Sequence, residues 1–285
     1  MIRGFSTRPR TSYFIASVAA VAWFFPVQAQ APVPAAPAAA TTPSDAEIER
    51  FLLAAKPIKS RAAPKGVTNS IRATFSDGTL THDAQIQTVE ESRQMAPKPG
   101  GMELNFRDSW SFNIAAYRLD RLIGLNLVPV SVEGRWQSKR AAITWWVDDV
   151  MMDEGERLKK KAQPPRPAEW AEIMNLVRIF DQLIYNMDRN QGNLLITQDW
   201  RIWAIDHTRA FRLHRDLKDP ENVARCDRQM FEKLKQLDSE TLKREMEDYL
   251  NQWEREAILA RRDLIVEIIE KRGPGALFDR RDAHN

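Results

Sequence analysis

Three polar side chains in the second half of the 285-residue chain are the ones best suited to chemistry: Asp188, Asn193 and Asp206. Asn193 and Asp206 flank a predicted β-hairpin, in which the apolar segments 194–197 and 201–205 form the strands. Because the outer ends of a hairpin meet, we expect Asn193 to lie opposite Asp206, roughly 5 Å away. Asp188 lies on the preceding loop, so its carboxylate can fold back over the same place. The sequence therefore predicts three converging oxygen groups.

Oxygen atoms are the ligands that hard divalent cations prefer, usually as one or two carboxylates together with phosphates of a substrate. Asn193 and Asp206 fit the role of ligands to Mg²⁺ or Mn²⁺. Asp188 is then free to orient a hydroxyl group and accept its proton. Protein kinases divide these tasks in this way with the spacing D-x-x-x-x-N, which Asp188 and Asn193 reproduce. Taken singly, each residue is also explained as a turn former or cap of a hairpin.

Further motifs surround these residues. Asn186-Met187-Asp188-Arg189 precedes the hairpin, and residues 205–211, IDHTRAF, follow it. Upstream, residues 114–124 read IAAYRLDRLIG and are followed by Val128-Pro129. In this order the motifs resemble the atypical kinases of the secretory pathway, the Golgi casein kinase family and its bacterial relatives, and more distantly the phosphatidylinositol 4-kinases. The resemblance covers most of residues 63–235. It implies an α+β, two-lobed protein-kinase-like fold with a β-rich N-lobe and a helical C-lobe.

The sequence departs from that family at two positions. The family's third strand carries A-x-x-K, and its regulatory helix carries E-I-A-A with a glutamate that orients the lysine. Here Gln87 occupies the lysine position and Asn113 the glutamate position. Replacing both partners leaves a neutral Gln–Asn hydrogen bond, whereas replacing one would leave a buried charge uncompensated. Either another cation such as Arg107 or Lys65 substitutes near the phosphates, or transfer is slow, or nucleotide binds without turnover.

Other nucleotide contacts are expected by resemblance. Gly66, Thr68 and Asn69 lie at the turn that would face the phosphates, ahead of the predicted strand 70–75 and a return strand at 81–89. With one glycine, this segment is equally well explained as a plain hairpin turn. Val147 ends an apolar segment suited to a buried strand and begins the connector between lobes, where adenine would meet backbone groups.

The N-terminus predicts export. Arg3, Arg8 and Arg10 precede an apolar run from about 13 to 27, and small residues follow at a cleavage position. An uncleaved anchor is the alternative. We therefore expect a periplasmic or secreted protein with no membrane segment beyond this one. The predicted division is a signal peptide (1–29), a Pro/Ala-rich linker (30–43), an N-lobe with a leading helix (44–150), a C-lobe (151–275) and a flexible tail (276–285).

Charge and cysteine content argue against a nucleic-acid-binding protein and against a disulfide-stabilised one. Loss of the three leader arginines leaves 39 of the 42 basic residues, which balance the 39 acidic ones, so nucleic acid is not an expected partner. Cys226 is the only cysteine, which excludes an intrachain disulfide. It fits a small buried hydrophobic residue.

The C-terminal part is predicted to be helical. One helix should deliver Asp188 from a start near Pro167. Another, capped by Asp238 or Ser239, should place Leu242, Met246, Tyr249 and Trp253 on one face. His207 is expected on an exposed loop.

The leading hypothesis is an exported phosphotransferase that uses ATP or another nucleotide with Mg²⁺ or Mn²⁺. Its acceptor would be a hydroxyl group of a protein, sugar or lipid. The alternative, motivated by Gln87 and Asn113, is a pseudokinase that acts as a nucleotide-binding or protein-interaction module. A third class, a metal-assisted hydrolase, would use the same oxygen ligands.

Overall fold

The computed structural model describes residues 43–62, 70–98 and 101–280. The predicted signal peptide and all of the linker except Pro43 lie outside the described residues, and so do Lys65, Gly66, Thr68 and Asn69. None of the described helices is long and apolar enough to cross a membrane.

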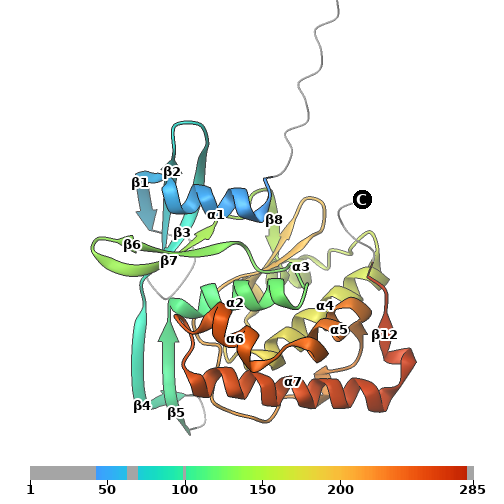
Figure 1. Cartoon of the computed structure of the whole chain (residues 1–285). Coiled ribbons are helices and arrows are strands. Elements are labelled where there is room, and N and C mark those ends of the chain that lie inside the picture. The colour runs from blue at the N-terminus through green and yellow to red at the C-terminus, as the bar shows by residue number, and fades with distance from the viewer. Residues whose placement is uncertain (1–42, 63–69, 99–100, 281–285) are drawn as a thin grey trace, which may run out of the picture. The chain divides into compact units, whose positions relative to one another are not determined.

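An antiparallel sheet with the strand order β1-β2-β3-β7-β6 forms the N-lobe (Figure 1). Strands β2 and β3 form within the predicted strand segments 70–75 and 81–89, and side chains alternate along them, so Ala73, Phe75, Ala84 and Ile86 are buried on one face. The strands span Lys56–Ala62 (β1), Ile71–Ser76 (β2), Thr81–Gln87 (β3), Ser131–Trp136 (β6) and Lys139–Trp145 (β7).

Two helices cover this sheet, α1 (Asp45–Ala54) and α2 (Ser111–Leu122) (Figure 1). A capping box between Ser44 and Glu47 starts α1, because the serine and glutamate side chains satisfy backbone N–H groups that the first turn leaves free. Helix α2 lies between the sheet and the C-lobe helices and is buried along most of its length. It ends where Gly124 adopts a φ of 68°, a left-handed conformation that favours glycine.

A separate hairpin, β4 (Glu90–Lys98) and β5 (Gly101–Ser109), is inserted between β3 and α2. It extends from the sheet towards the start of α7 (Figure 1), where Arg107 forms an ion pair with the buried Glu254. Its outward face is apolar and exposed at Met95, Met102 and Leu104.

The C-lobe contains a small sheet of order β10-β9-β8 and a set of helices. Helix α4 starts at Pro167 as predicted, and its apolar stripe packs into the core through Leu176, Val177, Phe180 and Leu183. The elements are β8 (Val150–Asp153), α3 (Glu154–Lys160), α4 (Pro167–Leu183), β9 (Leu194–Thr197), β10 (Ile202–Ala204), β11 (Cys226–Asp227), α5 (Arg228–Gln236), α6 (Ser239–Met246), α7 (Gln252–Arg272) and β12 (Leu277–Phe278).

The C-terminal region differs from the sequence-based expectation in two ways. The helix that begins at Ser239 ends at Met246, and a new capping box of Asn251 with Glu254 starts α7, so Trp253 is exposed and not on the shared apolar face. Residues 276–280, predicted as the start of a flexible tail, are held in place because β12 pairs with β11 and Arg280 donates to the carbonyls of Gly124 and Leu125.

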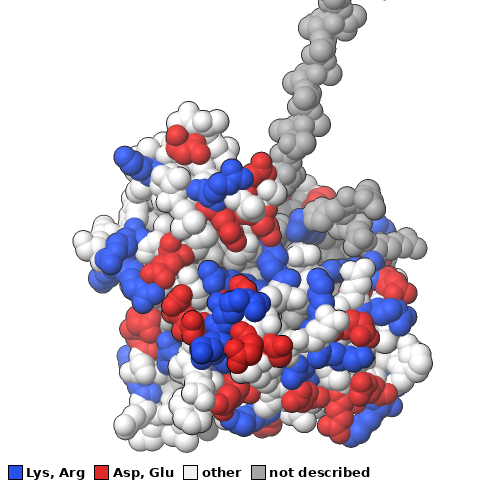
Figure 2. All heavy atoms as spheres, viewed as in Figure 1, with Lys and Arg blue, Asp and Glu red and all other residues white. Residues whose placement is uncertain are grey.

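Lys and Arg side chains are interspersed with Asp and Glu on the face of the molecule shown in Figure 2. That face therefore carries no broad field of one sign, the feature that nucleic-acid binding uses.

Candidate active site

The predicted hairpin between Asn193 and Asp206 is formed by β9 and β10, which pair Leu194 with Ala204. The expectation that Asn193 lies opposite Asp206 is wrong by one residue. Thr197 pairs with Arg201 across the turn, so Asn193 falls opposite Ile205 and receives a hydrogen bond from its backbone N–H at 3.0 Å. Asp206 follows immediately and lies at the same end of the hairpin.

Arg189 binds together the segments that carry the three candidate residues. Its guanidinium donates to the backbone carbonyls of Asn193 at 3.2 Å and Ile205 at 2.9 Å, and to the Asp181 carboxylate at 3.0 Å. It also donates to Nε2 of His207 at 2.9 Å. One side chain therefore fixes the Asp188 loop, the start of β9 and the exit of β10 relative to the end of α4.

His207 is buried, which corrects the prediction that it lies on an exposed loop. Burial lowers the pKa of its imidazole well below the usual value, and the neighbouring charge of Arg189 acts in the same direction. The neutral ring can then accept the hydrogen bond from Arg189. His207 is therefore a structural support next to Asp206 and not a substrate contact.

Asp188 presents an exposed carboxylate beside this support. Its backbone N–H donates to Oδ1 of Asn186 at 3.0 Å, and its carbonyl accepts a hydrogen bond from the Asn193 amide nitrogen at 3.3 Å. The side chain is 53% exposed, and its Oδ2 lies 3.9 Å from a guanidinium nitrogen of Arg209. The backbone is thus fixed while the carboxylate stays accessible to a hydroxyl group.

Asp206 adopts a left-handed conformation, with a φ of 55°. This conformation is uncommon for residues other than glycine, and strain of this kind concentrates at functional sites. The partly buried carboxylate accepts hydrogen bonds from Nε2 of Gln87 and from the hydroxyl of Thr208, both at 3.2 Å. Asp206 is therefore connected directly to strand β3 of the N-lobe.

Gln87 and Asn113 form the hydrogen bond that the sequence predicts, with the amide of Asn113 donating to Oε1 of Gln87. Both side chains are buried. Oδ1 of Asn113 also accepts the backbone N–H of His207 at 2.9 Å. The amide pair thus links β3, α2 and the segment after Asp206 without any charge.

The other residues predicted to contact nucleotide are not linked by hydrogen bonds to Asp188, Asn193 or Asp206 in the described part of the chain. Val147 is buried at the junction between β7 of the N-lobe and β8, which pairs with β9 in the C-lobe. Arg107, considered as a substitute cation, is paired with Glu254 and Glu90. Gly66, Thr68, Asn69 and Lys65 lie outside the described residues.

Two arginines of the segment after Asp206 were not identified from the sequence. Arg209 and Arg212 both pair with Glu103 of β5, at 2.9 and 2.7 Å, and both guanidinium groups lie over the Phe106 ring. Arg209 is the one whose other nitrogen approaches Asp188. No local motif marks these pairs, because Glu103 and its partners are more than 100 residues apart.

The side chains of Asn193 and Asp206 form part of a donor set for a metal ion. Among the described residues, no group of three or more His, Cys, Asp and Glu side chains is arranged to hold a metal. The oxygens of Asn193 and Asp206 would supply two ligands and leave the others to phosphates and water. That is the usual arrangement for Mg²⁺ in nucleotide sites, so the residues fit.

Comparisons with known proteins identify the fold. No family model matches the chain, and no curated protein matches its sequence. The solved structure of hydra Fam20 with sugar matches with a TM-score of 0.59 and 15% identity, over 86% of this chain and 95% of that one. The Golgi casein kinase matches with a TM-score of 0.58 and 15% identity, over 84% of this chain and 79% of that one.

The Golgi casein kinase with Mn/ADP bound gives a similar result, with a TM-score of 0.57 and 14% identity over 82% of this chain and 78% of that one. Identities at this level establish the fold and not the activity. The predicted α+β, two-lobed fold is confirmed, with strands mainly before residue 150 and helices mainly after it. The chain thus has the fold of Fam20 and the Golgi casein kinase, the atypical secretory-pathway kinases that its motifs resemble.

Proposed function

We propose that the protein is an exported kinase-like phosphotransferase that moves a phosphoryl group from ATP or another nucleotide to a hydroxyl acceptor. The observation that carries this proposal is the convergence of Asp188, Asn193 and Asp206 on one loop and one hairpin end, held by Arg189. The kinase fold supports the reaction class, and the leader sequence supports export.

In this proposal Asp188 is the base. Its carboxylate is accessible to an acceptor hydroxyl, which it would orient and whose proton it would accept. Asn193 and Asp206 would hold Mg²⁺ or Mn²⁺, and a bound cation of this kind neutralises charge on the phosphate oxygens. Arg209 lies on the acceptor side, where it orients the Asp188 carboxylate from 3.9 Å.

A second candidate is favoured by one observation, the neutral Gln87–Asn113 pair at the positions of the family's ion pair. Without that lysine, positive charge near the phosphates is reduced. The protein would then be a pseudokinase that binds nucleotide, or a partner protein, without efficient transfer.

Thermal unfolding of the purified protein tests nucleotide binding. ATP, ADP and GTP would each be added with and without Mg²⁺ or Mn²⁺. A ligand at 100 times its dissociation constant should stabilise the fold by about 2.7 kcal/mol. We expect a metal-dependent rise in the midpoint that Asp206→Ala abolishes. Asp216→Ala, which removes a carboxylate that is 76% exposed, is the matched control and should keep the rise.

Transfer is measured next, with labelled nucleotide and panels of protein, sugar and lipid acceptors. Asp188→Ala should bind nucleotide as well as the wild type but lose transfer. Binding without transfer in the wild type would favour the pseudokinase. No shift with any nucleotide would refute the phosphotransferase and would leave a protein-interaction module on a kinase scaffold.

A further inference from the structure

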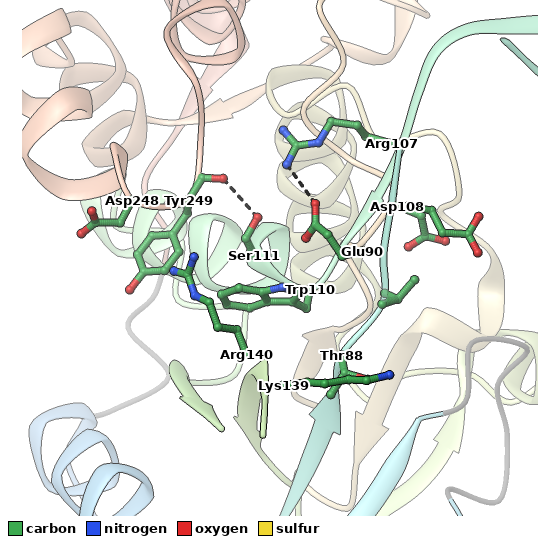
Figure 3. Close-up of a pocket in the computed structure, with 12 residues that line it drawn as sticks. Thr88, Glu90, Arg107, Asp108, Trp110, Ser111, Lys139, Arg140, Asp248 and Tyr249 are labelled. Atoms are coloured by element: carbon green, nitrogen blue, oxygen red, sulfur yellow. Dashed lines mark hydrogen bonds and ion pairs between the residues drawn. The ribbon is translucent and has the colours of Figure 1, made fainter. Parts of the chain in front are cut away.

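A buried carboxylate of the β4–β5 hairpin has no role in the proposed function described so far. Asp108 is the penultimate residue of β5 and is 7% exposed. Figure 3 shows its side chain pointing away from the neighbouring Arg107 and from the ion pair of Arg107 with Glu90. Among the described residues, Oδ1 of Asp108 has no hydrogen-bond partner. A buried carboxylate oxygen without a donor is costly, so its position calls for a ligand.

Thr208 lies between Asp108 and Asp206 of the candidate metal site. The Thr208 hydroxyl donates to the carboxylate of Asp206 at 3.2 Å and lies close enough to that of Asp108 to stabilise its charged form. A hydroxyl carries one proton, so it can donate fully to only one of the two carboxylates at a time. The backbone fixes this arrangement, because the Ser109 N–H donates to the Thr208 carbonyl at 2.9 Å.

The negative charges of Asp108 and Asp206 are only partly compensated by the groups around them. Burial raises the pKa of Asp108 above its usual range, and the negative charge of Asp206 acts in the same direction. Thr208 and Arg209 oppose these effects, and the buried Arg212 also interacts with Asp108, but both guanidinium groups are shared with Glu103. Two like charges around one hydroxyl therefore lack a dedicated counter-charge, which a divalent cation would provide.

We infer that Asp108 supplies a second carboxylate to the divalent cation bound by Asp206. This inference rests on the proposed function and extends its metal site to the inserted hairpin. Asp108 would give the site a negatively charged ligand from the residues just before α2, the helix in which the neutral Asn113 occupies the family's glutamate position. With the oxygens of Asp206 and Asn193 it provides two carboxylates and one amide, a set suited to Mg²⁺ or Mn²⁺ together with a nucleotide diphosphate.

Titration calorimetry of the purified protein with Mn²⁺ in the presence of ADP tests the inference. Asp108→Asn keeps the shape of the side chain and removes its charge. We expect the dissociation constant of Mn²⁺ to rise at least tenfold. Glu91→Gln is the matched control, because Glu91 pairs with Asp108 across the hairpin, is half exposed and contacts Arg93. It should change the dissociation constant by less than twofold.

The thermal midpoint without metal distinguishes a ligand from a structural residue. Asp108→Asn removes like-charge repulsion and lets an amide donate to a neighbouring oxygen, so the metal-free midpoint should stay the same or rise. A lower midpoint together with unchanged Mn²⁺ affinity would mean that Asp108 is structural, and the inference would be wrong.

The outcomes for the two proposals can be separated. If the wild type binds Mn²⁺ with ADP and Asp206→Asn abolishes binding, but Asp108→Asn binds within twofold of the wild type, then only this inference fails. If the wild type itself shows no metal-dependent binding of ADP, the proposed function fails as well.

Discussion

The Gln87–Asn113 pair allows a quantitative test of how the site is built. Asn113 is 5% exposed and Gln87 is 2% exposed. Asn113→Glu would place a carboxylate at a buried position linked through Gln87 to Asp206, without a cation at hand. Leaving a buried charge uncompensated typically costs about 3–5 kcal/mol, so we expect Asn113→Glu to lower the free energy of unfolding by that amount.

Gln87→Lys should be less harmful. The Gln87 amide lies 3.2 Å from the Asp206 carboxylate, so an ammonium group there would have an acidic neighbour. We expect a loss of about 2 kcal/mol, because the charge is still desolvated. In the double variant the new lysine and glutamate face each other. Their coupling free energy should reach about 2–3 kcal/mol, the upper range for contacting residues.

Urea unfolding of the four proteins without metal gives each free energy by linear extrapolation. A second cycle with Gln85→Lys in place of Gln87→Lys is the control, because Gln85 lies on the same strand but bonds to Ser70. That cycle should be additive within about 0.5 kcal/mol. If the Gln87 cycle is equally additive, the two amides do not occupy one coupled position and our reasoning about them is refuted.

Three further predictions concern stability and reactivity. Glu103→Gln should lower the free energy of unfolding by about 3 kcal/mol in urea experiments, because Arg212 is 5% exposed and would lose the carboxylate that pairs with it. The exposed-site control Glu91→Gln should lower it by less than about 0.5 kcal/mol. Burial raises the pKa of Asp120 to about 6 from its ordinary 3.8, so the folded state binds more protons between these values. Protonation of Asp120 therefore contributes up to about 3 kcal/mol to the free energy of unfolding below pH 3.8, and this contribution is lost as the pH rises through 6. Asp120→Asn should remove this pH dependence of the free energy of unfolding, measured with urea across the same range. Burial also raises the pKa of the Cys226 thiol to about 12, so a maleimide at pH 8 should label it only as fast as the protein opens, and rapid labelling of the native protein would contradict its burial.

Local patterns predicted the elements whose burial is regular. The alternation in β2 and β3 and the stripe of α4 follow from one face packing on the core, which a sequence records directly. The Gln87–Asn113 hydrogen bond was also predictable, because the resemblance supplied the pairing and physical chemistry supplied its neutral form. The grouping of Asp188, Asn193 and Asp206 followed from hairpin geometry, although their register was wrong by one residue.

The inserted hairpin was not predicted, for a physical reason. Both β4 and β5 are largely exposed, so they carry no regular apolar alternation. Their position is set by distant charges, such as Glu103 with Arg209 and Arg212. The burial of His207 was likewise decided by a partner 18 residues away, Arg189. Contacts of this kind depend on the assembled fold and leave no local pattern.

The contacts of Arg189 have a consequence for how the protein opens. A single guanidinium joins the end of α4, the loop of Asp188 and the exit of β10, so none of these segments can open without losing bonds to the others. They should therefore behave as one cooperative unit in native-state hydrogen exchange. The backbone amides of Asn193 and Ile205, although distant in sequence, should exchange with the same opening free energy.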